Sequence, residues 1–266
     1  MGQTDGLQAE VCQCLAALKG KAMIKFAVCA ACFLIFTFEL TATSYSQSFN
    51  SKKPLVVIDQ ALTAVGSGSA EVVKKRLFTE QITVVDAEAR RRAIEALPGS
   101  LQRQRITQGK LFRHIESALR QALQLHDRLT HGQVELFLYH DALPMAQLWR
   151  GGVLMISDGL AEPLSDTETI GIIAHELGHS YFEDEMAAAQ RQKDTQAMRV
   201  VELKCDAVAI VSLKLFGQEP KRYLQGLKTT KELMRRDSLG SSISQSHPEL
   251  VERELFCQRL IKSLGI

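Results

Sequence analysis

One short stretch of the chain combines metal-binding and proton-transferring side chains at helical spacing. It reads His175-Glu176-Leu177-Gly178-His179. Because residues four apart lie on one face of a helix, the two imidazoles can reach the same metal ion. Zinc binds neutral imidazole readily and prefers a tetrahedral shell. A glutamate directly after the first histidine lies beside that metal rather than ligating it, which is the place for a general base acting on a zinc-activated water.

The residues around this motif predict a buried helix. Ser165 followed by Glu168 forms a capping box, which places the start of the helix near Asp166. Apolar residues lie nearly all round the segment: Ile170, Ile172, Ile173, Ala174 and Leu177. Histidines and a glutamate are costly to bury without partners, and a metal ion is the natural partner for all of them.

A catalytic zinc needs three protein ligands and an open position. A third histidine six residues after His179 would indicate the metzincin pattern. Phe182 and Glu185 stand where its glycine and histidine belong, so that class is excluded. The remaining option is a glutamate from a following helix.

Glu202 fits this role, since it lies in a predicted helix over residues 200–216 that can run antiparallel to the metal helix. Asp206 is one turn further on the same face, where it can accept the second N–H of a ligand histidine and fix its tautomer. The alternative interpretation is that Glu202 is only an exposed charged residue. The acids at 183–185 are less suitable because they lie at or just beyond the end of the metal helix.

The remaining pattern predicts an α+β fold that is mainly helical. Strands are expected over 134–139 and 153–157, with a loop over 141–150 between them. Further helices are expected over 70–78, 86–97, 107–130, 220–236 and 247–264. His114, His126 and His131 on or beside the long helix are interpreted as surface residues, since none has a partner at ligand spacing.

Composition and the first residues indicate one exported globular domain. The chain has 266 residues, 45% hydrophobic, with a net charge of +2, and this balance gives no indication of nucleic-acid binding. An apolar run over 26–38 is followed by small residues, so 1–44 is interpreted as a signal peptide cleaved after Ser44, with Met23 as a possible true start. An uncleaved membrane anchor is the alternative. A polar tether over 45–54 and one peptidase domain over 55–266 would follow.

Two cysteines remain after this leader. Cys205 and Cys257 could pair in an oxidising compartment, or they could be two buried thiols. The sequence leaves both alternatives open. Residues 55–129 carry no motif that indicates a role.

Three motifs together resemble the signatures of the HtpX-like zinc metallopeptidases, the family of the type I CAAX prenyl endopeptidases and their soluble periplasmic relatives. They are His175-Glu176-x-x-His179, Glu202-x-x-x-Asp206 and His247-Pro248-x-x-x-x-Arg253. The resemblance covers residues 134–264. It departs where Cys205 replaces the family's usual alanine before Asp206. No membrane helix is evident after the leader, so prenyl substrates are not carried over.

The resemblance implies a gluzincin-type zinc endopeptidase with a small sheet beside the metal helix and one zinc ion per chain. The substrate would be a peptide or unfolded envelope or secreted protein, bound along Val153–Ser157 as the edge strand. His247 would donate a hydrogen bond to the oxyanion, or swing inward onto the open position of the zinc and hold the enzyme inactive. Arg253 would anchor this segment by pairing with Asp206.

Two other kinds of protein remain as alternatives. One is a non-catalytic zinc-binding chaperone or assembly factor that holds peptides in the same cleft. The other has a structural zinc with His247 as its fourth ligand. Glu176 argues against the first, because a purely structural site has no use for a base.

Overall fold

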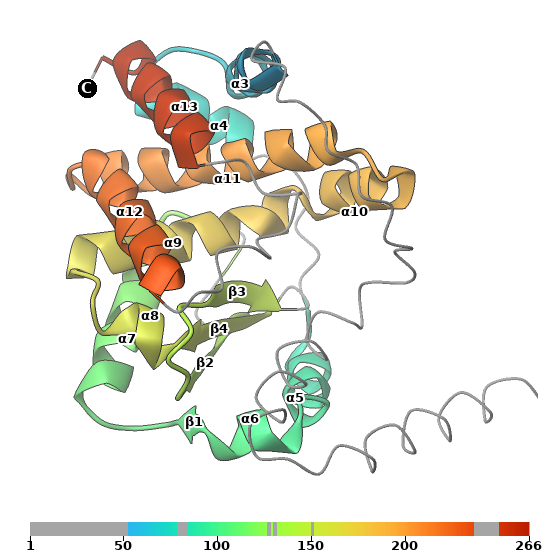
Figure 1. Ribbon diagram of the computed structural model, residues 1–266, viewed down its shortest axis with the longest axis vertical. Coiled ribbons are helices and arrows are strands. Elements are labelled where there is room, and N and C mark those ends of the chain that lie inside the picture. Colours follow the sequence, from blue (N-terminus) through green and yellow to red (C-terminus); the bar gives the residue numbers. More distant parts are fainter. Residues whose placement is uncertain are drawn as a thin grey trace, which may run out of the picture. The chain divides into compact units, whose positions relative to one another are not determined.

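The computed structural model is mainly helical and contains one small mixed sheet (Figure 1). It describes residues 53–78, 85–126, 129, 132–149, 152–236 and 250–265. All of them fall within one of the two units into which the chain divides, Asn50–Ile266. The predicted leader and His247 lie outside the described residues. Among the helices described, none is long and apolar enough to cross a membrane.

The elements follow one another from α3 to α13. The helices are α3 (Lys53–Val65), α4 (Ala70–Leu77), α5 (Ala87–Glu95), α6 (Gly99–Arg103), α7 (Lys110–Leu123), α8 (Asp158–Ala161), α9 (Asp166–Gly178), α10 (Glu183–Gln192), α11 (Thr195–Leu215), α12 (Lys221–Arg236) and α13 (Leu250–Ser263), with one 3-10 turn, η1 (His179–Tyr181). The strands are β1 (Arg105–Ile106), β2 (Glu135–Tyr139), β3 (Ala146–Trp149) and β4 (Val153–Ser157). Helix α3 begins inside the predicted polar tether.

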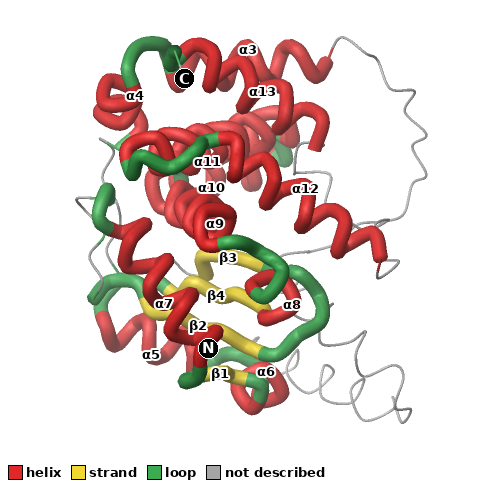
Figure 2. The backbone as a smooth tube through the Cα atoms, turned by 90° about the vertical axis from the view of Figure 1, so that its left-hand side faces the viewer, coloured by secondary structure: helices red, strands yellow, loops and turns green. Residues whose placement is uncertain are grey.

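The sheet has the strand order β1-β2-β4-β3, shown in yellow in Figure 2. Strand β4 pairs in parallel with β2 on one side and antiparallel with β3 on the other. The prediction that Val153–Ser157 is an edge strand is therefore wrong, because both of its edges are already hydrogen-bonded. The edge strand next to β4 is β3, which forms inside the segment predicted to be a loop.

Both faces of the sheet are buried, and residues alternate between them. Leu136, Leu138, Leu154 and Ile156 join the large core that also contains α7, α9 and α11. Phe137, Tyr139, Val153 and Met155 face a smaller cluster with residues of α5 and α6. This alternation follows from the two-residue period of a strand, and continuous apolar runs are typical of strands covered on both sides.

Helix α9 carries the metal motif and is buried among α7, α11, α12 and β3. The predicted capping box is confirmed, since the Ser165 N–H donates to Glu168 Oε2 at 2.8 Å. Helix α11 lies directly against α9. A Cβ atom on Gly178 would be 3.1 Å from the Cα of Cys205, so glycine permits this close approach of the two backbones.

The long helix predicted over 107–130 is shorter than expected, spanning only Lys110–Leu123. Gly109 precedes it with a φ of 104°, a conformation that favours glycine and separates the helix from β1. The interpretation of His126 as a surface residue is wrong, since it is only 1% exposed. His126 packs in a cluster of three rings with Phe78 and Tyr181, and its Nδ1 lies 2.8 Å from the Tyr181 hydroxyl.

Burial of His126 should make the stability of the protein depend on pH. Burial lowers the pKa of His126 from 6.5 to about 3, so the unfolded chain binds a proton that the folded chain does not. The contribution of the neutral, buried His126 to the free energy of unfolding is complete above pH 6.5. It is lost as the pH falls towards 3, and the free energy of unfolding then decreases by up to about 1.4 kcal/mol per pH unit. In His126→Phe, the free energy of unfolding in urea should fall less steeply between pH 6.5 and 5 than in the wild type. The control is His114→Gln, which alters a partly exposed histidine. If the free energy of unfolding depends on pH equally steeply in the wild type and in His126→Phe, the expectation is contradicted.

Candidate active site

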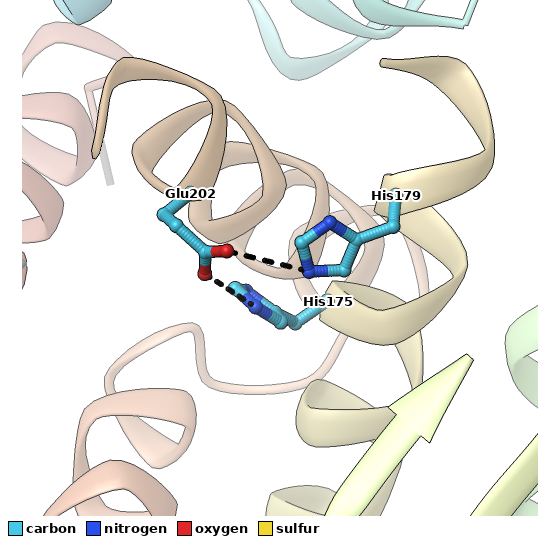
Figure 3. A group of neighbouring side chains, drawn as sticks. All are labelled: His175, His179 and Glu202. Atoms are coloured by element: carbon cyan, nitrogen blue, oxygen red, sulfur yellow. Dashed lines mark ion pairs between the residues drawn. The ribbon is translucent and has the colours of Figure 1, made fainter. Parts of the chain in front are cut away.

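The structure brings three potential metal ligands together from three helical elements. His175 lies near the end of α9, His179 begins η1, and Glu202 lies on α11. Their donor atoms are all within 4.8 Å of one another. Figure 3 shows the Glu202 carboxylate pointing at both imidazoles: Oε2 is 3.5 Å from His175 Nε2 and Oε1 is 3.9 Å from His179 Nε2.

The donor set fits a zinc ion. Zinc–nitrogen and zinc–oxygen bonds of about 2.0–2.1 Å in a tetrahedron separate neighbouring donors by roughly 3.3 Å, somewhat less than the 3.5 and 3.9 Å between the Glu202 oxygens and the two imidazoles. Two imidazoles and one carboxylate leave a fourth position open, as catalytic sites require. His175 and Glu202 are buried, whereas the His179 side chain is 26% exposed, so His179 is the candidate ligand closest to solvent.

The outer nitrogen of His175 faces a buried polar network. His175 Nδ1 lies 2.9 Å from Asp206 Oδ1. Arg253 binds the same carboxylate with two hydrogen bonds, from Nε to Oδ2 at 2.9 Å and from Nη2 to Oδ1 at 2.5 Å. The pairing of Arg253 with Asp206, predicted from the resemblance, is thus present. Through it, α13 contacts the site.

This network sets the charges around His175. Burial would raise the pKa of the Asp206 carboxyl, but Arg253 and the hydrogen bond with His175 outweigh it and hold that pKa below its ordinary value. Burial would likewise lower the pKa of His175, but hydrogen bonds to Asp206 and Glu202 outweigh it and raise the pKa to about 9. Asp206 is therefore a fixed negative charge behind the imidazole, as expected of a group that orients a ligand histidine.

Glu176 lies next to His175 and is not part of the three-donor cluster. Its Oε2 accepts a hydrogen bond of 3.2 Å from the Leu148 N–H of β3. That N–H is therefore turned towards α9 and not towards β4. Burial raises the pKa of Glu176 from 4.5 to about 7. A carboxyl group with such a pKa can both take up and release a proton near neutrality.

Two neighbours of the ligand candidates were not recognised from the sequence. Cys205 Sγ lies 3.6 Å from His179 Nδ1, and burial raises the pKa of this thiol well above its ordinary value. Cys205 and Cys257 are free buried thiols and do not form a disulfide, which was the other alternative. Tyr223 of α12 places its hydroxyl 2.9 Å from His175 Nδ1. A single tyrosine in an amphipathic helix carries no signal that would have revealed this contact.

The residues predicted for the site thus converge, apart from one. His175, His179, Glu202, Asp206 and Arg253 meet at one place, and Glu176 lies beside them. His247 is outside the described residues, and both of its roles stay predictions.

Comparison with known proteins gives the same picture. Residues 107–203 match Peptidase family M48, a stretch that runs from the segment before α7 to Glu202 and its neighbour on α11. No curated protein matches the chain. Metallopeptidases of this kind generally use zinc. Together with the cluster of His175, His179 and Glu202, the match supports a zinc metallopeptidase family for this chain.

Proposed function

We propose that the protein is a zinc-dependent endopeptidase that hydrolyses peptide bonds of envelope or secreted proteins. The observation that carries this proposal is the position of Glu176. It follows a ligand candidate on the same helix, stays outside the three-donor cluster, and reaches the edge strand through Leu148. A site that only held a metal ion for structural reasons would not need this additional carboxylate.

The residues of this chain divide the chemistry between them. His175, His179 and Glu202 would hold the metal, and Asp206 with Arg253 would keep His175 oriented. A bound zinc ion would supply Lewis acidity that activates water and polarises the peptide carbonyl. Glu176 would accept the proton of the attacking water and then deliver it to the leaving amine. No side chain forms a covalent bond with the substrate in this scheme.

The substrate would pair with β3 and not with β4. Within the part of the chain that the structure describes, β3 pairs only with β4, on one of its two sides. Its other side lies towards α9, where the Leu148 N–H meets Glu176. An extended peptide that adds a strand at such an edge gains main-chain hydrogen bonds. It would also run past the general base.

A peptide-holding chaperone and a structural zinc protein are the competing functions. Zinc content and casein hydrolysis, measured on the same purified protein, separate the three. The endopeptidase should contain stoichiometric zinc and cleave casein, and a chelator should abolish the cleavage. Stoichiometric zinc without cleavage would refute the proposal and favour one of the other two functions.

We further propose that the protein is exported and that its leader is removed. The support is the apolar run at 26–38 followed by small residues at Ala42 and Ser44. N-terminal sequencing of exported protein should begin near Tyr45 or Gln47. An intact Met1 or Met23 terminus on membrane-bound protein would favour the uncleaved anchor instead.

A further inference from the structure

Tyr223 is fully buried and lies against the side of His175 that faces away from Glu202. Its ring is nearly parallel to the imidazole, with centroids 6.1 Å apart and planes 23° apart. Its hydroxyl contacts His175, Asp206 and Arg253 at once. Four helices therefore meet at this one oxygen: α9, α11, α12 and α13.

We propose that Tyr223 is a positioning residue that keeps the proton of His175 on Nδ1, so that Nε2 presents its lone pair to the metal. The proposal rests on the metal site described above and adds a residue from α12 to the groups that orient it. It concerns metal affinity, which can be measured whether or not the protein cleaves peptides.

The hydrogen-bond donors and acceptors around the hydroxyl support this role. A guanidinium can only donate, and Arg253 Nη2 lies 2.6 Å from Tyr223 Oη. The Tyr223 O–H donates to Asp206 Oδ1 at 2.5 Å. The one hydroxyl proton is thereby used, so towards His175 Nδ1 the oxygen of Tyr223 can act only as an acceptor. Nδ1 must then carry the proton, which it shares between Tyr223 and Asp206.

The Tyr223 hydroxyl also counteracts Arg253, which disfavours a proton on His175 Nδ1. Arg253 Nη2 is 3.3 Å from His175 Nδ1, and a donor at that place favours a bare Nδ1. In a neutral imidazole, a bare Nδ1 means a proton on Nε2, where the metal must bind. The Tyr223 oxygen accepts a hydrogen bond from Arg253 and offers an acceptor to His175, and so opposes that arrangement.

A glycine on α9 allows α12 to place Tyr223 there. Gly171 lies one turn before His175 on α9, and a Cβ atom on it would be 3.1 Å from Tyr223 Cδ2. The absence of a side chain at Gly171 lets α12 approach α9 closely enough for the Tyr223 hydroxyl to reach the imidazole.

The test is the zinc affinity of Tyr223→Phe, measured by competition with a chromophoric chelator on the purified full chain. Tyr223→Phe should bind zinc about 10-fold more weakly, at the low end of the effect of groups that orient metal ligands. Tyr181→Phe is the matched control. It also removes a buried hydroxyl bonded to an imidazole, that of His126. Its zinc affinity should change by less than about 2-fold, because His126, the partner of this hydroxyl, is not among the candidate metal ligands.

Substitution of Co²⁺ for Zn²⁺ provides a second measurement, since the visible absorption of bound Co²⁺ reports the geometry of its ligands. The spectrum should change in Tyr223→Phe and stay that of the wild type in Tyr181→Phe. Equal losses of zinc affinity in the two variants, or wild-type affinity in Tyr223→Phe, would overturn the proposal. Should Tyr223→Phe fail to fold, Gly171→Ala keeps the hydroxyl but displaces the ring. It should weaken zinc binding roughly 3-fold by distorting the hydrogen bond to His175, and unchanged affinity there would also refute the proposal.

Discussion

Replacing Glu176 by glutamine should remove nearly all peptide hydrolysis and leave stoichiometric zinc in place. Glutamine has the shape of glutamate, but its amide cannot accept the proton of the attacking water. Loss of a general base typically lowers the rate by about 100- to 10,000-fold. Because Glu176 lies outside the cluster of metal-binding donors, the affinity for zinc should not depend on its charge.

This expectation is checked by measuring casein hydrolysis and zinc content on the same preparation. Glu183→Gln is the matched control, since it neutralises an exposed acid at the start of α10. Its activity should equal that of the wild type. Retained hydrolysis in Glu176→Gln would refute the mechanism, whereas a loss of zinc would show that Glu176 is a ligand and not the base.

Replacing Glu202 by alanine should abolish stoichiometric zinc binding. The two imidazoles of His175 and His179 would remain, but a zinc site with only two protein ligands is incomplete. The variant would also lose the stabilisation that a ligand confers by binding only the folded state. Adding zinc should therefore raise the unfolding temperature of the wild-type protein and not that of Glu202→Ala.

Metal analysis after dialysis, together with thermal unfolding with and without zinc, measures both effects. Glu185→Ala is an informative control, because Glu185 belongs to the neighbouring acids that the sequence offers as alternative ligands. In the structure its Oε1 lies 2.5 Å from Lys204 Nζ, and the variant should keep its zinc. Normal zinc binding in Glu202→Ala would show that the third ligand has been assigned wrongly.

Much of the site can be deduced from the sequence because its geometry is local. Residues four apart on a helix lie on the same face whatever surrounds them, so His175 and His179 converge by helical periodicity alone. The same holds for Glu202 and Asp206 on α11. The start of α9 was also predictable, since a capping box satisfies backbone groups within a single turn. The partner of Asp206 lies 47 residues away at Arg253, and only the family resemblance suggested it.

Other features depend on contacts between distant segments, and these the tertiary structure alone decides. Whether Val153–Ser157 is an edge or an inner strand depends on β3, whose four residues after Pro144 look like a loop until they pair with β4. The burial of His126 depends on Phe78 and Tyr181, which approach it from α4 and η1. Tyr223 reaches His175 because Gly171 lets α12 cross α9 closely. Periodicity shows which face of a helix is buried, but the group that this face meets is set by the packing of the whole chain.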